Sequence, residues 1–187
     1  MRLRSGGSVR RLVAGAVVVT AIVVATGPGP AGAGSAPSIA LLTAVDVSDQ
    51  GSFDRVTFTF EGGPPEVLQA AYFSGPVSLT PSGEPLEPPL AGEARLTLTL
   101  SNASGVDLSM DPFVDTFPGP DRIQPDLPAL VDLALVGDFE ATMNWAFGLR
   151  GGEVRAEVRV EASPTRVVVD IPHSAPRAIV ARPSFTG

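Results

Sequence analysis

The stretch Gly137–Leu149 has the sequence Gly-Asp-Phe-Glu-Ala-Thr-Met-Asn-Trp-Ala-Phe-Gly-Leu. Apolar residues occupy every odd position from 139 to 149, and the even positions are small or polar. Successive side chains of a strand point to opposite faces of a sheet, so this period of two predicts a half-buried β-strand. The stretch also holds the only Trp of the chain and two of its nine Phe. We therefore predict that it forms the central core strand of an all-β domain.

Seven other segments show the same alternation, or the β-branched and aromatic enrichment that is typical of strands. They are Ser38–Ser48, Phe53–Glu61, Glu66–Phe73, Glu93–Asn102, Leu130–Val136, Glu153–Glu161 and Thr165–Ile171. The residues Arg150-Gly151-Gly152 predict a hairpin turn between Gly137–Leu149 and Glu153–Glu161. Eight antiparallel strands joined by long irregular connections predict an antiparallel β-sandwich.

The pattern also predicts what covers the strands and what fills the core. Ser74–Gly92 contains five Pro and three Gly and predicts a long surface loop, a kind that is usually functional or mobile. Charges of alternating sign along Glu153–Glu161 predict a solvent-facing row that protects an edge strand from pairing with other chains. We expect five large apolar side chains in the core: Phe58, Phe139, Trp145, Val167 and Val169.

The N-terminus has the layout of a secretory signal peptide, with a basic head, the apolar run Leu12–Thr26 and small residues after it. We predict a signal peptide over residues 1–33, cleaved after Ala33, with Ala36 as a second choice. The apolar run is shorter than the roughly 20 residues that span a bilayer, and a retained N-terminal anchor is the alternative. The predicted location is therefore outside the cell membrane, extracellular or associated with the cell wall.

The rest of the chain divides into three predicted parts. A short linker covers residues 34–37, and a β-sandwich domain covers residues 38–172. A flexible tail that contains Pro and Arg covers residues 173–187.

Composition excludes several classes of function. The chain has no Cys, which excludes disulfides, thiol chemistry and Cys-ligated metals. Beyond the four Arg of the leader, nine Arg face 20 Asp and Glu, so the formal charge of that part is near −11. Such a surface repels the phosphates of nucleic acids, which are therefore not expected as partners. A membrane is expected as a partner only through an uncleaved leader.

The side-chain inventory offers little for catalysis. The one His, His173, precedes a Pro-rich tail, whereas a catalytic triad or a zinc site needs ordered His side chains. Asp138 and Glu140 would share a strand face about 7 Å apart, which suits a hydrolase that uses two carboxylates. Acids on the outer face of a strand are usually only solvated, so we predict no catalytic residue, no cofactor and no metal site.

Two arginines are candidate ligand contacts, because each lies early in a predicted strand with an acid nearby. A guanidinium group binds carboxylates through two parallel hydrogen bonds. We predict that Arg55 and Arg166 bind the ligand, with Asp54, Asp138 and Glu140 as partners or orienting groups. The alternative is that both arginines form structural ion pairs with neighbouring strands.

Five segments together resemble the AMIN-like domain of secreted proteins and lipoproteins from high-GC Gram-positive bacteria. They are Phe53–Phe58, Ser82–Pro85, Ala91–Leu96, Gly137–Glu140 with Trp145 and Gly148–Leu149, and Thr165–Asp170. The resemblance covers residues 38–172. That family is similar to the AMIN domain, a β-sandwich that places N-acetylmuramoyl-L-alanine amidases at peptidoglycan. Many relatives carry a lipid-modified Cys, which this chain lacks.

The resemblance implies a non-catalytic exported domain that binds the cell envelope, either peptidoglycan or an envelope-associated protein. A first alternative is an interaction module that docks another exported protein through a strand edge or through the Ser74–Gly92 loop. A second alternative is a hydrolase that uses Asp138 and Glu140.

Overall fold

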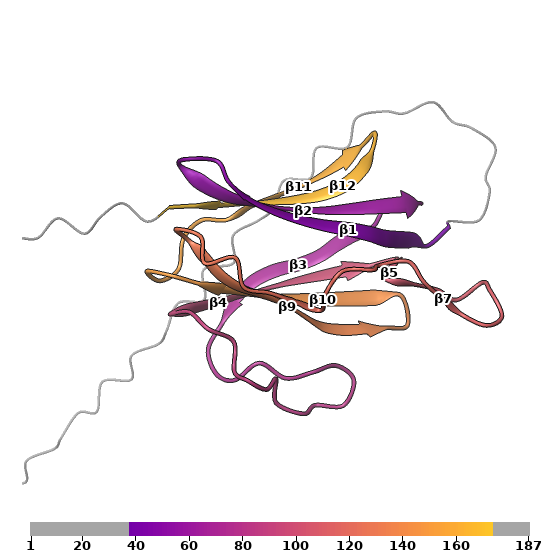
Figure 1. The fold of residues 1–187 in the computed structure, drawn as a ribbon, viewed down its shortest axis with the longest axis horizontal. Coiled ribbons are helices and arrows are strands. Elements are labelled where there is room, and N and C mark those ends of the chain that lie inside the picture. The colour runs from indigo at the N-terminus through magenta and orange to yellow at the C-terminus, as the bar shows by residue number, and fades with distance from the viewer. Residues whose placement is uncertain (1–37, 174–187) are drawn as a thin grey trace, which may run out of the picture.

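The computed structural model describes residues 38–173 as a two-layer β-sandwich (Figure 1). No helix occurs in this range, and hence none that is long and apolar enough to cross a membrane. The predicted fold class is therefore confirmed. The predicted signal peptide with its cleavage site at Ala33, the linker and residues 174–187 of the predicted tail lie outside the described residues.

The first sheet, sheet A, has the strand order β11-β12-β2-β1-β5. Its strands are β1 (Ala40–Asp49), β2 (Phe53–Gly62), β5 (Ala103–Ser104), β11 (Glu157–Ala162) and β12 (Thr165–Pro172). Neighbours are antiparallel except β1 and β5, which pair in parallel through two residues each. The strand with the charged row, β11, is an edge strand, as its alternating charges predict.

The second sheet, sheet B, has the strand order β3-β4-β10-β9-β8. Its strands are β3 (Glu66–Phe73), β4 (Ala94–Ser101), β8 (Arg122–Ile123), β9 (Leu130–Phe139) and β10 (Thr142–Leu149). A separate pair, β6 (Val106–Asp107) and β7 (Val114–Asp115), forms an arm that projects beyond the sheets (Figure 1).

The core between the two sheets is built around Trp145, which is fully buried on β10. Its ring packs against Phe58 of β2 with the centroids 5.1 Å apart, and edge-on against Phe117 with the centroids 6.1 Å apart. Val167 and Val169 of β12 are also fully buried. Burial of each Val or Phe side chain contributes about 1.5–3 kcal/mol, so these contacts join the two sheets.

The stretch Gly137–Leu149 forms two strands, so the prediction of a single strand was wrong. Glu140 and Ala141 have φ values of 50° and 55°, the left-handed conformation of a two-residue hairpin turn. Phe139 pairs with Thr142, and paired residues share a face of the sheet, so Phe139 lies on the face opposite the core residue Met143. Phe139 is accordingly 49% exposed and does not belong to the core, contrary to prediction.

The loop Ser74–Gly92 covers the outer face of β9 and β10, so β10 is buried on both faces over most of its length. The loop contributes Val77 and Leu90 to a second apolar cluster, which the strands complete with Ala134, Val136 and Ala146. A Cβ on Gly148 would overlap the carbonyl group of Ala91, so a glycine there lets the loop lie against the strand. The predicted surface loop is thus an extra layer packed on sheet B.

The predicted hairpin at Arg150-Gly151-Gly152 was also wrong, because β10 and β11 belong to different sheets. The chain crosses from sheet B to sheet A over residues 150–156, where Val154 and Ala156 pack against the core. Tyr72 holds this crossing, since its hydroxyl donates a hydrogen bond to the carbonyl of Val154 and accepts one from the amide of the same residue.

A β-bulge between Leu42 and Ala44 changes which side chains of β1 face inward. Before the bulge, Ala40 and Leu42 are fully buried, and after it Val45 and Val47 pack on the core. One continuous alternation in the sequence therefore covers two different phases of burial.

Candidate functional site

Arg55 lies on the outer face of sheet A, where β2 is flanked by β12 and β1. It stands opposite Asp170 in the register of β2 and β12. Its Nε and Nη2 atoms donate hydrogen bonds of 2.7 and 2.8 Å to the two oxygens of that carboxylate. The guanidinium carbon also lies 5.1 Å from the centre of the Phe53 ring, so an aromatic face and a carboxylate orient this cation together.

The same face carries two more arginines, one from the edge strand β11 and one from its neighbour β12. Arg159 of β11 donates a hydrogen bond of 2.6 Å to Asp170 and one of 3.2 Å to Glu161. Arg166 of β12 approaches Glu161 at 3.9 Å, beyond hydrogen-bond distance. We call the set Arg55, Arg159, Arg166, Asp170 and Glu161 the arginine ladder. It holds three cations and two anions, and the exposed Glu157, which stands opposite Asp170, adds a third acid to this face.

The ladder changes the titration of its own members. Hydrogen bonding from Arg55 holds the pKa of Asp170 below its usual 3.8, against an opposing contribution from burial, and Arg159 adds to the lowering. The hydrogen bond to Asp170 raises the pKa of Arg55 in turn. Asp170 is only 14% exposed, whereas Arg166 is 41% exposed, so Arg166 has N–H groups available for a ligand.

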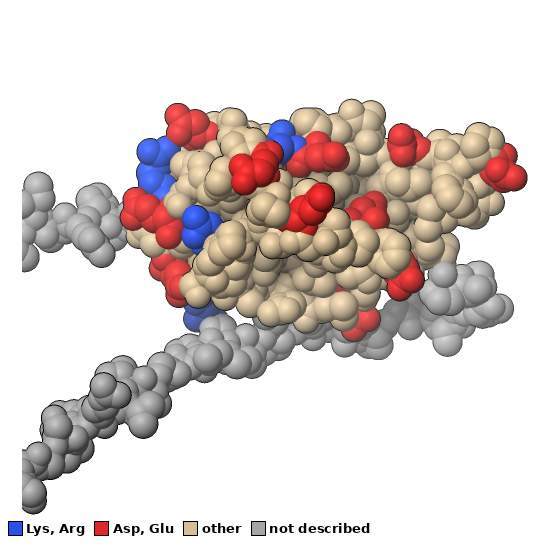
Figure 2. All heavy atoms as spheres, turned by 90° about the horizontal axis from the view of Figure 1, so that it is seen from below, with Lys and Arg blue, Asp and Glu red and all other residues tan. Residues whose placement is uncertain are grey.

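The ladder stands out because the domain as a whole is acidic. Residues 38–173 contain seven Arg and all 20 Asp and Glu of the chain, and three of those Arg lie on this one face. Figure 2 shows the opposite side of the molecule, where acidic side chains are spread widely and basic ones are few. A ligand that carries carboxylates would therefore be attracted locally only where cations gather.

Asp54, predicted as a ligand partner, lies in the interior of the fold. It is fully buried at an inward-facing position of β2. One carboxylate oxygen accepts hydrogen bonds of 2.7 Å from the amides of Ala129 and Leu130, and the other lies 2.7 Å from Nε2 of His173. Asp54 therefore anchors the chain before β9 and the end of β12.

His173, predicted to begin a flexible tail, is held in place. Its amide donates to the carbonyl of Ser52, and its ring contacts Asp54 and lies 3.8 Å from Asp49. These three side chains offer ligand atoms within 4.8 Å of one another, close enough for a cation. The oxygens of Asp54 already have three partners, so the geometry supports an anchor for the chain end.

Asp138 and Glu140 do not share a strand face, contrary to prediction. Asp138 of β9 accepts hydrogen bonds from the amide of Gly105 at 2.7 Å and the hydroxyl of Ser104 at 3.2 Å. Glu140 is exposed in the hairpin turn that follows. Asp138 is occupied in holding β5 beside β9, and the predicted pair of carboxylates for hydrolysis is not formed.

One ionic contact was missed from the sequence, since Asp132 lies within an apolar run. Asp132 is fully buried on β9 and accepts two hydrogen bonds, of 3.0 and 2.6 Å, from Arg122. Arg122 also donates to the carbonyls of Pro88 and Pro89, and Asp132 accepts from the amide of Ala91. The hydrogen bond to Asp132 raises the pKa of Arg122. The pair fastens the Ser74–Gly92 loop to sheet B, and an acid inside a strand-like apolar run was the one signal for it.

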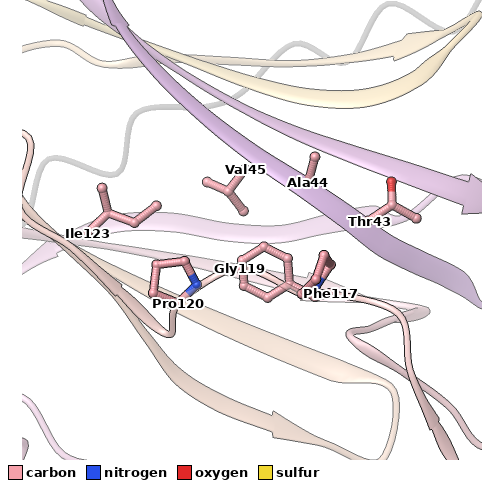
Figure 3. A pocket seen from close by; sticks show the side chains of 8 residues that line it. Thr43, Ala44, Val45, Phe117, Gly119, Pro120 and Ile123 are labelled. Carbon is pink, nitrogen blue, oxygen red and sulfur yellow. The ribbon is translucent and has the colours of Figure 1, made fainter.

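A groove lies between β1 and the segment Phe117–Ile123, and the sequence did not predict it. The cavity measures about 210 Å³. Its walls are mostly apolar, and the side chains of the two walls face each other in Figure 3. The lining residues are Thr43, Ala44, Val45, Phe117, Pro118, Gly119, Pro120 and Ile123.

Searches against curated proteins and against solved structures gave no match. The model of the AMIN-like domain matches residues 40–173, which is more than half of the chain and takes in both sheets. The two-layer β-sandwich and this match together show that the chain belongs to the AMIN-like domain family.

Proposed function

We propose that this protein is an exported, non-catalytic module that binds the cell envelope at peptidoglycan. The observation that supports the proposal most directly is the arginine ladder, which gathers three arginines on one face of an acidic domain. Membership of the AMIN-like family favours the envelope, and the basic and apolar leader favours export.

The chemistry of peptidoglycan suits such a face. Its peptide stems end in carboxylates, and its glycan strands present hydroxyl and amide groups. Among residues 38–173, no side chain hydrogen-bonds to the guanidinium group of Arg166, and such a group binds a carboxylate through two hydrogen bonds. Arg55 is held by Asp170 and presents its outer edge in a fixed orientation. We therefore assign the direct contact to Arg166 and the orienting role to Arg55.

The test is cosedimentation of residues 34–187 with purified peptidoglycan over a series of salt concentrations. We expect saturable binding that weakens as salt rises, because contacts between exposed charges are screened. Arg166→Ala should weaken binding several-fold with the same unfolding midpoint. Arg95→Ala on sheet B is the matched control, since it removes one Arg from the other sheet.

Two results would count against the proposal. Absence of binding by the unsubstituted domain at low salt would exclude peptidoglycan as the ligand. Equal loss of binding in Arg166→Ala and Arg95→Ala would show that net charge governs binding and that the ladder is no specific site.

The alternative, docking of another exported protein, is compatible with the same location. The Ser74–Gly92 loop is a weak candidate for such docking, because its apolar side chains are already packed against sheet B. The open edge of β1 is the better candidate.

A further inference from the structure

The outer edge of β1 is open for most of its length. On one side, β1 pairs with β2 from end to end. On the other side, only Ala40 and Leu41 pair, with the two residues of β5. Among residues 38–173, no strand pairs with this side of Thr43–Asp49, a length of about 23 Å at the rise of a strand. Backbone groups at such an edge can hydrogen-bond to an added strand.

The open edge runs directly beside the apolar groove. Val45 on β1 faces Phe117 and Ile123 across the cavity (Figure 3). Just before Phe117–Ile123 in the chain, the arm formed by β6 and β7 carries four exposed apolar side chains. They are Leu108, Met110, Phe113 and Val114, with exposed fractions of 45, 51, 67 and 46%. The groove is therefore continuous in the chain with a segment that exposes apolar side chains.

The unpaired charges beside the groove that residues 38–173 show are acidic. Asp121 is exposed directly after Pro120 of the groove wall, whereas the next residue, Arg122, is paired with the buried Asp132. On β1, the exposed Asp46 follows Val45 and lies on the other face of the strand. An added strand would thus meet an apolar wall on one face and the carboxylate of Asp46 on the other, with Asp121 exposed beside the wall.

We propose that this edge binds an extended segment of a protein partner in which apolar residues alternate with Lys or Arg. The segment adds to sheet A beside β1, since side chains of neighbouring strands share faces. Its apolar side chains enter the groove beside Val45, and its cations lie beside Asp46 and near Asp121. The proposal rests on other residues than the direct peptidoglycan contact, because Arg166 lies on β12, two strands away from β1.

The test is selection of peptides from a random decapeptide library by residues 34–187. We expect enriched sequences to alternate β-branched or aromatic residues with Lys or Arg. Binding of an enriched peptide should change the emission of Trp145, because Phe117 of the groove packs on that ring. Arg166→Ala should leave the affinity unchanged, which separates this site from the proposed peptidoglycan contact.

Two comparisons make the test decisive without disturbing the core. The exposed pair Asp46→Asn with Asp121→Asn should weaken binding about three- to tenfold. The matched control is Glu84→Gln with Glu87→Gln, two exposed acids in the loop on sheet B. Methylation of alternate backbone nitrogens in the peptide should abolish binding, because it removes the hydrogen bonds of an added strand.

Several results would overturn the proposal. They are failure to enrich any sequence, enrichment of sequences that lack the alternation, equal effects of the two double variants, or full binding by the methylated peptide.

Discussion

At the scale of single residues, the ion pairs of sheet A serve both stability and the candidate ligand face. Arg55 and Asp170 are partners across neighbouring strands, and their contact is the alternative that the sequence offered beside ligand binding. The two roles are compatible. Asp170 orients Arg55, whereas the Arg166 side chain only approaches Glu161 at 3.9 Å and makes no hydrogen bond within the described part of the chain.

Asp170 should make the protein sensitive to acid. Its pKa is lowered in the folded state by hydrogen bonds from Arg55 and Arg159, so its contribution is full above the ordinary value of 3.8 and is lost as pH falls through the folded pKa. Asp170→Asn should lower the free energy of unfolding at neutral pH by about 1–2 kcal/mol. It should also make that free energy fall less steeply as the pH is lowered. Urea unfolding between pH 6 and about 2 measures both effects. Asp126→Asn, which breaks an exposed pair with Arg150, should change little, and an equal change would contradict the prediction.

Asp54 should behave as a structural residue and not as a ligand contact. Asp54→Ala leaves the buried amides of Ala129 and Leu130 without partners, which costs about 3–5 kcal/mol. Urea unfolding measures the loss. Stability within about 1 kcal/mol of the unsubstituted protein would show that water replaces the carboxylate and that the anchor is not needed.

Tyr72 provides a titration that needs no labelling, because it is the only Tyr of the chain. Burial raises its pKa above the ordinary 10.0, against the opposing effect of its hydrogen bond to Val154. The folded protein therefore retains a proton that the unfolded chain releases, and stability falls as pH rises above 10. The pH at which half of Tyr72 is ionised, measured by the absorbance of the phenolate, should be higher in the folded protein than in the urea-unfolded chain. Coincident midpoints would mean that the crossing between the sheets opens freely.

Among the strands and turns, the two-residue turn Glu140–Ala141 determines which side chains of Gly137–Leu149 are buried. Ala141 adopts the left-handed backbone conformation, which lowers stability because a Cβ disfavours that conformation. Ala141→Gly should therefore stabilise the protein by about 0.5 kcal/mol, after the larger entropy loss of glycine is included. Thermal unfolding measures the difference. Ala71→Gly in the middle of β3 is the control and should destabilise; a loss of stability in both variants would argue against the turn.

At the scale of the whole molecule, the protein has three layers, because the Ser74–Gly92 loop lies over sheet B. Gly148→Ala should cost about 1–3 kcal/mol, since the added Cβ would overlap the backbone at Ala91. Limited proteolysis should then cut within the loop before the sheets unfold. Gly83→Asn, at an open left-handed position in the same loop, should show neither change. Resistance of the loop in Gly148→Ala would mean that it is held without close packing against β10.

The number of long strands and the inward faces of β2 and β4 can be read from the amino-acid pattern alone, because a period of two is a local consequence of strand geometry. It also indicated that Arg55 and Arg166 lie near acids, since cations beside acids in strands are visible without a fold; ligand binding by these two arginines stays a prediction. The turn at Glu140, the crossing of residues 150–156 and the groove beside β1 became visible only in the folded chain. Alternation shows that a side chain is buried but not which partner buries it. Partners far apart in the sequence, such as Asp54 with His173, meet only when two sheets pack together.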